Sequence, residues 1–377
     1  MDLIGVLRNR YIMRQRRDQI RREQIYNNRI TRRQLRDASN PFTLPECVFQ
    51  GIYRLSKDLV SALIEDLRPF LHERERTTGI PLQHKVLCAL NFFGQGSFQK
   101  AVGCDFILGL SQTSVSRCLD EVVAALNRPE ILAANVRFPD SEAERRAIIR
   151  MHYQRCPIPG VLGYVDGTHI RIIAPTMNEE AFVNRKQFHS LNVQIVATSN
   201  YKILNVLARY PGSSQNSFIW ANSAIRTRME QLYRAGAECW LLGDSGYPEE
   251  PWLHVPFLNA PEGSAEAEFS SQLKISRSSV ERTMGHLKSR FQCLHVHRVL
   301  MYSPENAARI VNACIVLHNK CLDARLPHFE IIPEDRVPQE NVIRPPPAEG
   351  RQRDRLLRVG QVVRQRLVDR LRQAAAN

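Results

Sequence analysis

The feature that most constrains the fold is an apolar run at residues 160–173 that is interrupted by one carboxylate, Asp166. The run is rich in Val and Ile and begins directly after Pro159, which predicts a strand buried on both faces. A carboxylate in such a strand costs free energy unless a partner pairs with it. A bound divalent cation is one such partner. The alternative is that Asp166 caps a turn or pairs with a buried arginine, and this run alone leaves both interpretations open.

The residues that follow predict the rest of a sheet. Strands are expected at residues 190–199 and 203–210, a helix at 222–235 and a further buried strand at 239–243. Asp244 comes directly after that last strand. A second carboxylate therefore stands at the carboxyl end of a buried strand.

A helix is predicted at residues 275–291, because apolar residues recur there at helical spacing. Its opposite stripe carries Arg277, Glu281, Gly285 and Lys288. This combination suits an acid directed at a metal, beside a surface where Arg277 and Lys288 contact a DNA phosphate backbone. The alternative is a solvated face with charge pairs between residues four apart, which is common on single helices.

Five other acids compete with Glu281 for the role of third carboxylate: Glu249, Glu250, Glu262, Glu266 and Glu268. The last three fall within residues 261–271, which we expect to form a loop. A metal ligand has to be held within about 0.5 Å, and a packed helix holds a side chain better than a loop does. Glu281 is therefore the preferred third acid.

The order of these predicted elements is that of an RNase H-like nuclease core. We therefore predict an α+β fold with a mixed RNase H-like sheet flanked by helices. Neighbouring carboxylates can hold two divalent cations about 3.5–4 Å apart, one activating a water or hydroxyl and the other stabilising the leaving oxygen. Carboxylate ligands with retained waters favour Mg²⁺ or Mn²⁺.

A helix-turn-helix is predicted before this core. A short helix at residues 97–103, a turn at 105–110 and a longer helix at 112–126 form the pattern. Thr113 and Arg117 lie on the outer side of the second helix, which suits contact with a DNA groove. The alternative is a plain helical bundle, since many such patterns never contact DNA.

Positive charge is concentrated at the two ends of the chain. Residues 1–40 hold eleven Arg and four acids, a net charge of +7, and residues 351–377 hold eight Arg and two Asp, a net charge of +6. The whole chain carries +14, so the remaining residues are nearly neutral. This favours nucleic acid as a partner, with an acidic protein or membrane surface as the second choice. Residues 351–377 also predict an amphipathic helix that could bind DNA, a partner protein or a second copy of the chain in a homo-oligomer.

The cysteines and apolar segments narrow the class of protein further. The nine cysteines form no CxxC pair and resemble reduced thiols of an intracellular protein. Cys314, His318 and Cys321 share a predicted helix near Cys293, but their spacing fits no compact zinc finger, so core packing is the preferred interpretation. No stretch approaches 18 consecutive apolar residues, so we expect no transmembrane helix. Because nucleic acid is the first choice of partner for the basic ends, we expect no membrane partner.

Several motifs between about residues 50 and 322 match one family. They include GSFQKAVG, LSQTSVSRCLDEV, VDGTHIRI, NRKQFHSLNVQ, LLGDSGYP and SVERTMGHLKSRFQCL. With these motifs the chain resembles the PIF/Harbinger transposases and the harbinger transposase-derived nucleases, and the last two motifs are specific. The resemblance implies that Asp166, Asp244 and Glu281 are the catalytic DDE metal ligands. It also implies DNA substrates and a separate Myb-like partner that aids DNA binding and nuclear entry.

The chain departs from this family at two places near the predicted site. Gln215-Asn216 replace a His-Asp pair of many relatives, and Ala197-Thr198 replace an Asp at the end of a strand. These differences bear on transposition, because acids near the site tune metals or strand position. The triad is intact, which favours a metal-dependent DDE-type nuclease that cleaves DNA phosphodiester bonds. The alternative is a catalytically silent, domesticated transposase that acts as a DNA-binding or adaptor protein. The triad argues against this alternative, because unpaired buried carboxylates destabilise a fold.

These patterns divide the chain into five segments. They are an Arg-rich arm at residues 1–40, a helical helix-turn-helix domain at 41–135, an RNase H-like nuclease domain at 136–325, a Pro-rich linker at 326–350 and a basic amphipathic helix at 351–377. The nucleus is the expected compartment, with the cytoplasm as a second one, because the arm contains the basic runs RRDQIRR and TRRQLR.

Overall fold

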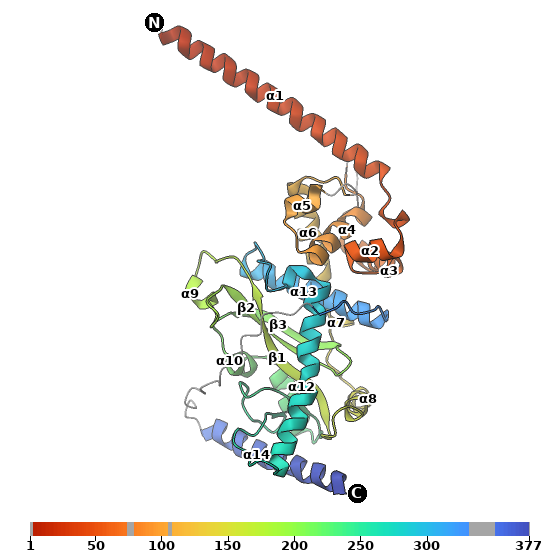
Figure 1. Cartoon of the computed structure of the whole chain (residues 1–377), viewed down its shortest axis with the longest axis vertical. Helices are drawn as coiled ribbons and strands as arrows, with labels where there is room; N and C mark the ends of the chain where they lie inside the picture. The colour runs from red at the N-terminus through yellow and green to blue at the C-terminus, as the bar shows by residue number, and fades with distance from the viewer. Residues whose placement is uncertain (1–2, 74–78, 105–107, 332–350, 377) are drawn as a thin grey trace. The chain divides into compact units, whose positions relative to one another are not determined.

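The structure, a computed structural model, describes residues 3–73, 79–104, 108–331 and 351–376. The chain forms two compact units, Met1–Ala125 and Leu126–Asn377 (Figure 1). Part of the predicted turn at 105–110 and most of the predicted Pro-rich linker lie outside the described residues.

The described part of the first unit is helical. Its helices are α1 (Leu3–Ala38), α2 (Glu46–Tyr53), α3 (Lys57–Leu67), α4 (Leu82–Gln95), α5 (Gln99–Cys104) and α6 (Gln112–Leu126), with 3-10 turns at Pro41–Thr43 and Arg68–Phe70. α4 is buried along most of its length and packs against α2, α3 and α5. The two helices of the predicted helix-turn-helix correspond to α5 and α6.

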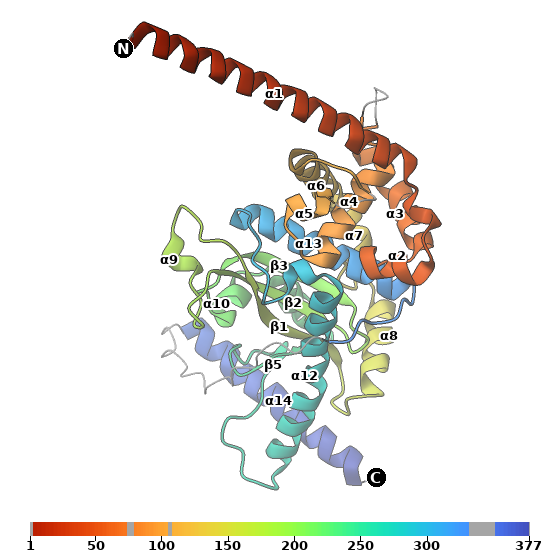
Figure 2. The ribbon, with the colours of Figure 1, turned by 45° about the horizontal axis from the view of Figure 1, so that its top comes forward.

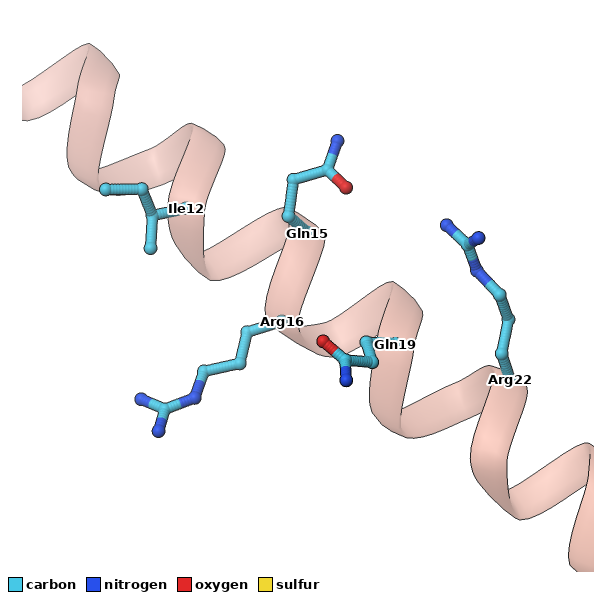
Figure 3. A pocket seen from close by; sticks show the side chains of 5 residues that line it. All are labelled: Ile12, Gln15, Arg16, Gln19 and Arg22. Atoms are coloured by element: carbon cyan, nitrogen blue, oxygen red, sulfur yellow. The ribbon is translucent and has the colours of Figure 1, made fainter.

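α1 is an Arg-rich helix that is exposed along most of its described length. Near its end it lies against Gly109, where φ is +52° and an added Cβ would come 2.6 Å from the Arg32 carbonyl oxygen. Only glycine tolerates both conditions. Figure 3 shows five side chains of α1 that project in different directions: Ile12, Gln15, Arg16, Gln19 and Arg22. We assign no ligand site to them, because no shared direction brings them together.

The second unit is α+β, as the sequence predicts. Its strands are β1 (Val161–Arg171), β2 (Ser190–Ala197), β3 (Ile203–Pro211), β4 (Trp240–Leu242) and β5 (Leu253–His254). They form one sheet in the order β3-β2-β1-β4-β5. β1 runs antiparallel to β2 and parallel to β4, so the sheet is mixed and β1 is its central strand.

Helices surround this sheet. They are α7 (Pro129–Asn135), α8 (Glu142–Tyr153), α9 (Glu179–Phe182), α10 (Asn216–Ala221), α11 (Ala224–Arg234), α12 (Ala265–Arg290), α13 (Pro304–Asp323) and α14 (Arg351–Ala376), with a 3-10 turn at Gln292–Leu294. α12 packs against β1 and β2, and α13 packs against β3. Figures 1 and 2 both show α12 crossing the sheet. Trp220, Ile225 and Met229 from α10 and α11 join the strand residues Leu162 and Leu241 in an apolar core.

Of the sequence-based expectations about these helices, one is confirmed and one is wrong. The helix expected at 222–235 corresponds to α11, which Ser223 caps by accepting a hydrogen bond from the Arg226 N–H at 3.2 Å. The loop expected at 261–271 contains the start of α12. Ser264 caps α12 by accepting from the Ala267 N–H at 3.1 Å, and Phe269 anchors its first turns in the core.

α14 packs against α12 and β5 of its own unit. Leu367 and Val368 are buried, and Arg364 Nη1 donates to the Val255 carbonyl oxygen at 2.8 Å. The apolar stripe of the predicted basic helix is therefore used within the chain. Among the described residues, no helix has both the length and the apolar character needed to cross a membrane.

Candidate active site

Asp166 lies near the middle of the central strand β1 and is 7% exposed. The Gly167 N–H donates to its Oδ1 at 2.8 Å, and Arg277 Nη1 donates to its Oδ2 at 2.6 Å. Both carboxylate oxygens are therefore held. Of the interpretations that the sequence left open, pairing with a largely buried arginine is present in this structure.

Asp244 follows β4, the parallel neighbour of β1. Tyr164 of β1 is aligned with Leu242 of β4, and Asp166 and Asp244 each come two residues later. Residues two apart on an extended chain point to the same side, and neighbouring strands are about 4.8 Å apart. The two carboxylates are therefore brought together by the register of the sheet. The Gly246 N–H donates to Asp244 Oδ1 at 3.0 Å and fixes its orientation.

Glu281 approaches from α12. Buried Val280 and Met284 hold the helix against the rest of the unit, whereas the Glu281 side chain is 47% exposed. Its Oε1 accepts a hydrogen bond from Arg277 Nη2 at 2.8 Å, so the charge pair four residues apart that the sequence also allowed is present. One guanidinium, with its side chain 11% exposed, thus joins Asp166 to Glu281.

The electrostatics of the three acids are coupled. Burial raises the pKa of Asp166 to about 7, although Arg277 opposes this and Asp244 and Glu281 reinforce it. Burial also raises the pKa of Asp244, again against Arg277 and together with Glu281. Burial lowers the pKa of Arg277, but the three carboxylates outweigh it and raise that pKa overall. Each acid therefore lies within the field of the other two and of Arg277.

The three acids have the chemistry of a divalent-cation site, but two of them are paired with an arginine. Three carboxylates supply the oxygen ligands that Mg²⁺ and Mn²⁺ prefer. In the part of the chain that the structure describes, no group of three or more His, Cys, Asp or Glu is arranged to hold a metal ion, and Arg277 pairs with two of the three acids. The residues fit a divalent cation provided that Arg277 withdraws. The premise that the acids are unpaired without metal is wrong, since Arg277 pairs with two of them.

The rival acids Glu249 and Glu250 have other partners. Glu249 accepts from His254 Nδ1 at 2.7 Å and pairs with Arg364 at 3.0 Å, and all three are buried. Glu250 pairs with Arg226 at 2.8 Å. Glu266 and Glu268, expected in a loop, lie in the first turn of α12, well before Glu281. Glu281 is the acid that shares Arg277 with Asp166.

The four residues predicted to contact DNA lie in contrasting surroundings. Thr113 and Arg117 are exposed on α6. Arg277 is largely buried and Lys288 is buried, so the expectation that they line an open face of α12 is wrong. Packing against other segments explains this. Asp166 of the sheet pairs with Arg277. Ile331 covers the helix between the two cations, since an added Cβ on Gly285 would come 3.0 Å from its side chain.

Two residues near the acids were not predicted as part of the site. Asn216, one of the departures from the family, lies against Gly167, where an added Cβ would come 2.6 Å from its Oδ1. Tyr247 is buried, and burial together with the charges of Asp166 and Asp244 raises its pKa well above the usual value. Its place in the LLGDSGYP motif is the sequence signal that could have identified it.

The side chains considered for a zinc site, Cys293, Cys314, His318 and Cys321, are buried. Cys293 and Cys314 Sγ lie 3.8 Å apart in the core, and His318 Nε2 contacts the Tyr201 carbonyl oxygen at 3.0 Å. These side chains are packed as the preferred interpretation expects.

Comparison with known proteins defines the class of the second unit. The family described as "DDE superfamily endonuclease" matches residues 165–319, a range that contains Asp166, Asp244 and Glu281. The unit therefore carries a DDE endonuclease domain, and endonucleases of this superfamily use divalent metal ions. No solved structure matches the chain significantly.

Full-length relatives define the family more narrowly. The protein "Putative nuclease HARBI1" of Homo sapiens is 36% identical over 275 residues, which cover 72% of this chain and 77% of the relative. Its counterpart in Bos taurus is 35% identical over the same shares. "Protein ALP1-like" of Arabidopsis thaliana is 23% identical over 297 residues, or 73% of this chain and 70% of that protein. The chain belongs to the harbinger transposase-derived nuclease family.

Proposed function

We propose that the chain is a metal-dependent DDE-type nuclease that cleaves phosphodiester bonds in DNA, built on an RNase H-like sheet. One observation carries the proposal. Asp166 of β1 and Glu281 of α12 pair with one largely buried guanidinium, and the sheet register brings Asp244, at the end of β4, level with Asp166. Placing three carboxylates close together costs free energy. The packing of the fold does not need this arrangement, whereas binding a divalent cation does.

The three acids have different parts in this proposal. Asp166 and Asp244 are rigid, since each accepts a hydrogen bond from a nearby backbone N–H. Glu281 is half-exposed and completes the site from the solvent side. Divalent cations bound there would activate the attacking water or hydroxyl and stabilise the leaving oxygen. Asp166, Asp244 and Glu281 would hold them, and the backbone donors keep the first two carboxylates oriented.

The test is Mn²⁺-dependent nicking of a supercoiled plasmid or an element-end duplex. Asp166→Asn, Asp244→Asn and Glu281→Gln should each lower the nicking rate at least about 100-fold, because even a residue that only orients a metal ligand contributes 10–100-fold. Glu268→Gln is the matched control, because Glu268 is exposed on the same helix and should keep full activity. Circular dichroism checks the fold. Robust nicking by a folded Glu281→Gln protein would show that the third acid is misassigned.

We propose that the first unit binds the DNA substrate. α5 and α6 act as a helix-turn-helix, with Thr113 and Arg117 facing the groove, and the arginine-rich ends neutralise phosphates. A Myb-like partner would assist DNA binding and entry into the nucleus, where we propose that the protein acts. A tagged chain that stays in the cytoplasm when its partner is present would contradict this location.

One observation favours the alternative function, a catalytically silent DNA-binding or adaptor protein. Arg277 pairs with Asp166 and Glu281, so the acids are stabilised without any metal. A wild-type protein that binds DNA but never nicks it in Mn²⁺, alone or with its partner, would establish the alternative.

A further inference from the structure

Arg277 occupies the space between the acids that a cation would need. Its Nη1 lies 2.6 Å from Asp166 Oδ2, and its Nη2 lies 2.8 Å from Glu281 Oε1. Its side chain is 11% exposed, so the two ion pairs are largely shielded from water. The guanidinium is therefore a resident counter-ion, held by two members of the triad through separate nitrogens.

A guanidinium and a divalent cation cannot share these oxygens. The oxygens that accept from Arg277 belong to the carboxylates that would bind the metal, and two positive charges about 4 Å apart repel each other strongly in a protein interior. The long side chain allows an exchange of position, because Arg277 lies one turn before the half-exposed Glu281 on α12. Rotation about its side-chain bonds can carry the guanidinium outward while the helix stays in place.

We propose that Arg277 is an exchangeable internal cation that links Asp166 to Glu281 in the metal-free protein and has to leave these carboxylates when a divalent cation binds. The inference rests on the proposed function, because it assumes that the triad is a metal site. It assigns to Arg277 the role of competitor for the site, in place of the fixed DNA contact that the sequence suggested. After leaving, Arg277 stands beside Glu281, where its charge can neutralise a bound phosphate.

The test compares Mn²⁺ binding by full-length wild type, Arg277→Gln and Arg277→Lys, with isothermal titration calorimetry and with melting curves in chelator and in Mn²⁺. Arg277→Gln should bind Mn²⁺ at least about tenfold more tightly than wild type, because a competing unit charge is removed. Its melting temperature in chelator should fall, and its stabilisation by Mn²⁺ should exceed that of wild type. Arg277→Lys keeps the charge without the two-nitrogen fork and should lie between the two.

Arg282→Gln is the control, because it makes the same charge change at an exposed position of the same helix. It should leave Mn²⁺ affinity within about twofold of wild type, as expected for a surface charge screened by solvent. If wild type binds Mn²⁺ and Arg277→Gln binds it equally or more weakly, the exchange is overturned and the proposed function stands. If neither protein binds Mn²⁺, both fall. Should Arg277→Gln not fold, equal Mn²⁺ affinity of Arg277→Lys and wild type overturns the exchange.

Discussion

At the scale of single residues, Asp166 sets the properties of the site. It is buried in the central strand, its neighbours are also acids, and its main partner is a cation from another element. A carboxylate so placed binds protons more readily than in an unfolded chain. Its proton and a metal are therefore alternative ways to neutralise it.

This predicts how the stability of the metal-free protein depends on pH. The folded pKa of Asp166, about 7, is raised above its ordinary value of 3.8. The stability gained from its protonation is thus fully present below the ordinary value and is lost as the pH rises through about 7. In chelator, the melting temperature of wild type should fall between pH 5 and pH 8, and Asp166→Asn should flatten this fall. An unchanged fall in Asp166→Asn would assign the effect to other groups.

A second prediction at this scale concerns Glu249, which is buried between His254 and Arg364. Removing one partner of a buried ion pair costs about 3–5 kcal/mol, so Glu249→Ala should lower the free energy of unfolding of this unit by that amount. Exposed Glu262→Ala should change it by less than about 0.5 kcal/mol. Urea unfolding monitored by tryptophan fluorescence measures both. Equal stability of the two variants would contradict the structural role of Glu249.

At the scale of elements, α12 and α6 present side chains in opposite ways. α12 holds Arg277 against Asp166 of the sheet, while Glu281 one turn later on the same helix is half-exposed. α6 buries Val115 and Leu119 and leaves Thr113 and Arg117 outside. A helix with one packed face and a free polar face is suited to a groove.

We therefore predict that Arg117→Ala weakens DNA binding. If Arg117 contacts a guanine, discrimination at that base pair should fall by about 1–3 kcal/mol. Arg68→Ala is the control, because Arg68 is an exposed arginine of the same unit whose partners are Glu65 and Glu73. Titrations with specific and random duplexes separate the outcomes. Unchanged binding of both duplexes by a folded Arg117→Ala protein would favour the plain helical bundle.

At the scale of the whole molecule, the net positive charge is concentrated at the two ends of the chain. The ends at residues 1–40 and 351–377 carry +7 and +6 of the net +14, whereas residues 41–350 are nearly neutral. The two ends are not equivalent, because α14 is packed on its unit through Leu367 and Val368. Deleting α14 would expose apolar surface as well as remove charge.

Substitution is consequently the cleaner test of the contribution of charge. The double variant Arg358→Gln with Arg366→Gln removes two exposed charges of α14. In a plot of the logarithm of DNA affinity against the logarithm of salt concentration, its slope should be shallower by up to about 0.9 for each phosphate that the protein no longer neutralises. Arg146→Gln with Arg150→Gln on α8 makes the same charge change outside the basic ends. Equal slopes for the two double variants would show that these two arginines of α14 bind no phosphates.

The sequence by itself determined the features that depend on local pattern. The strands were predictable because a short, Val- and Ile-rich run has few stable alternatives, and the acids at 166, 244 and 281 stood out as charges at the ends or on the faces of apolar elements. The start of α12 was missed, because the cap at Ser264 joins a small-residue segment to the apolar stripe without a strong local signal.

Only the tertiary structure decided what pairs with what. The register of β1 with β4 brings two acids level, although they are distant in the chain. The crossing of α12 over β1 converts Arg277 from a cation beside Glu281 into the shared partner of two acids. Contacts between remote segments depend on the packing of whole elements, and the local periodicity of a sequence carries no record of which elements become neighbours.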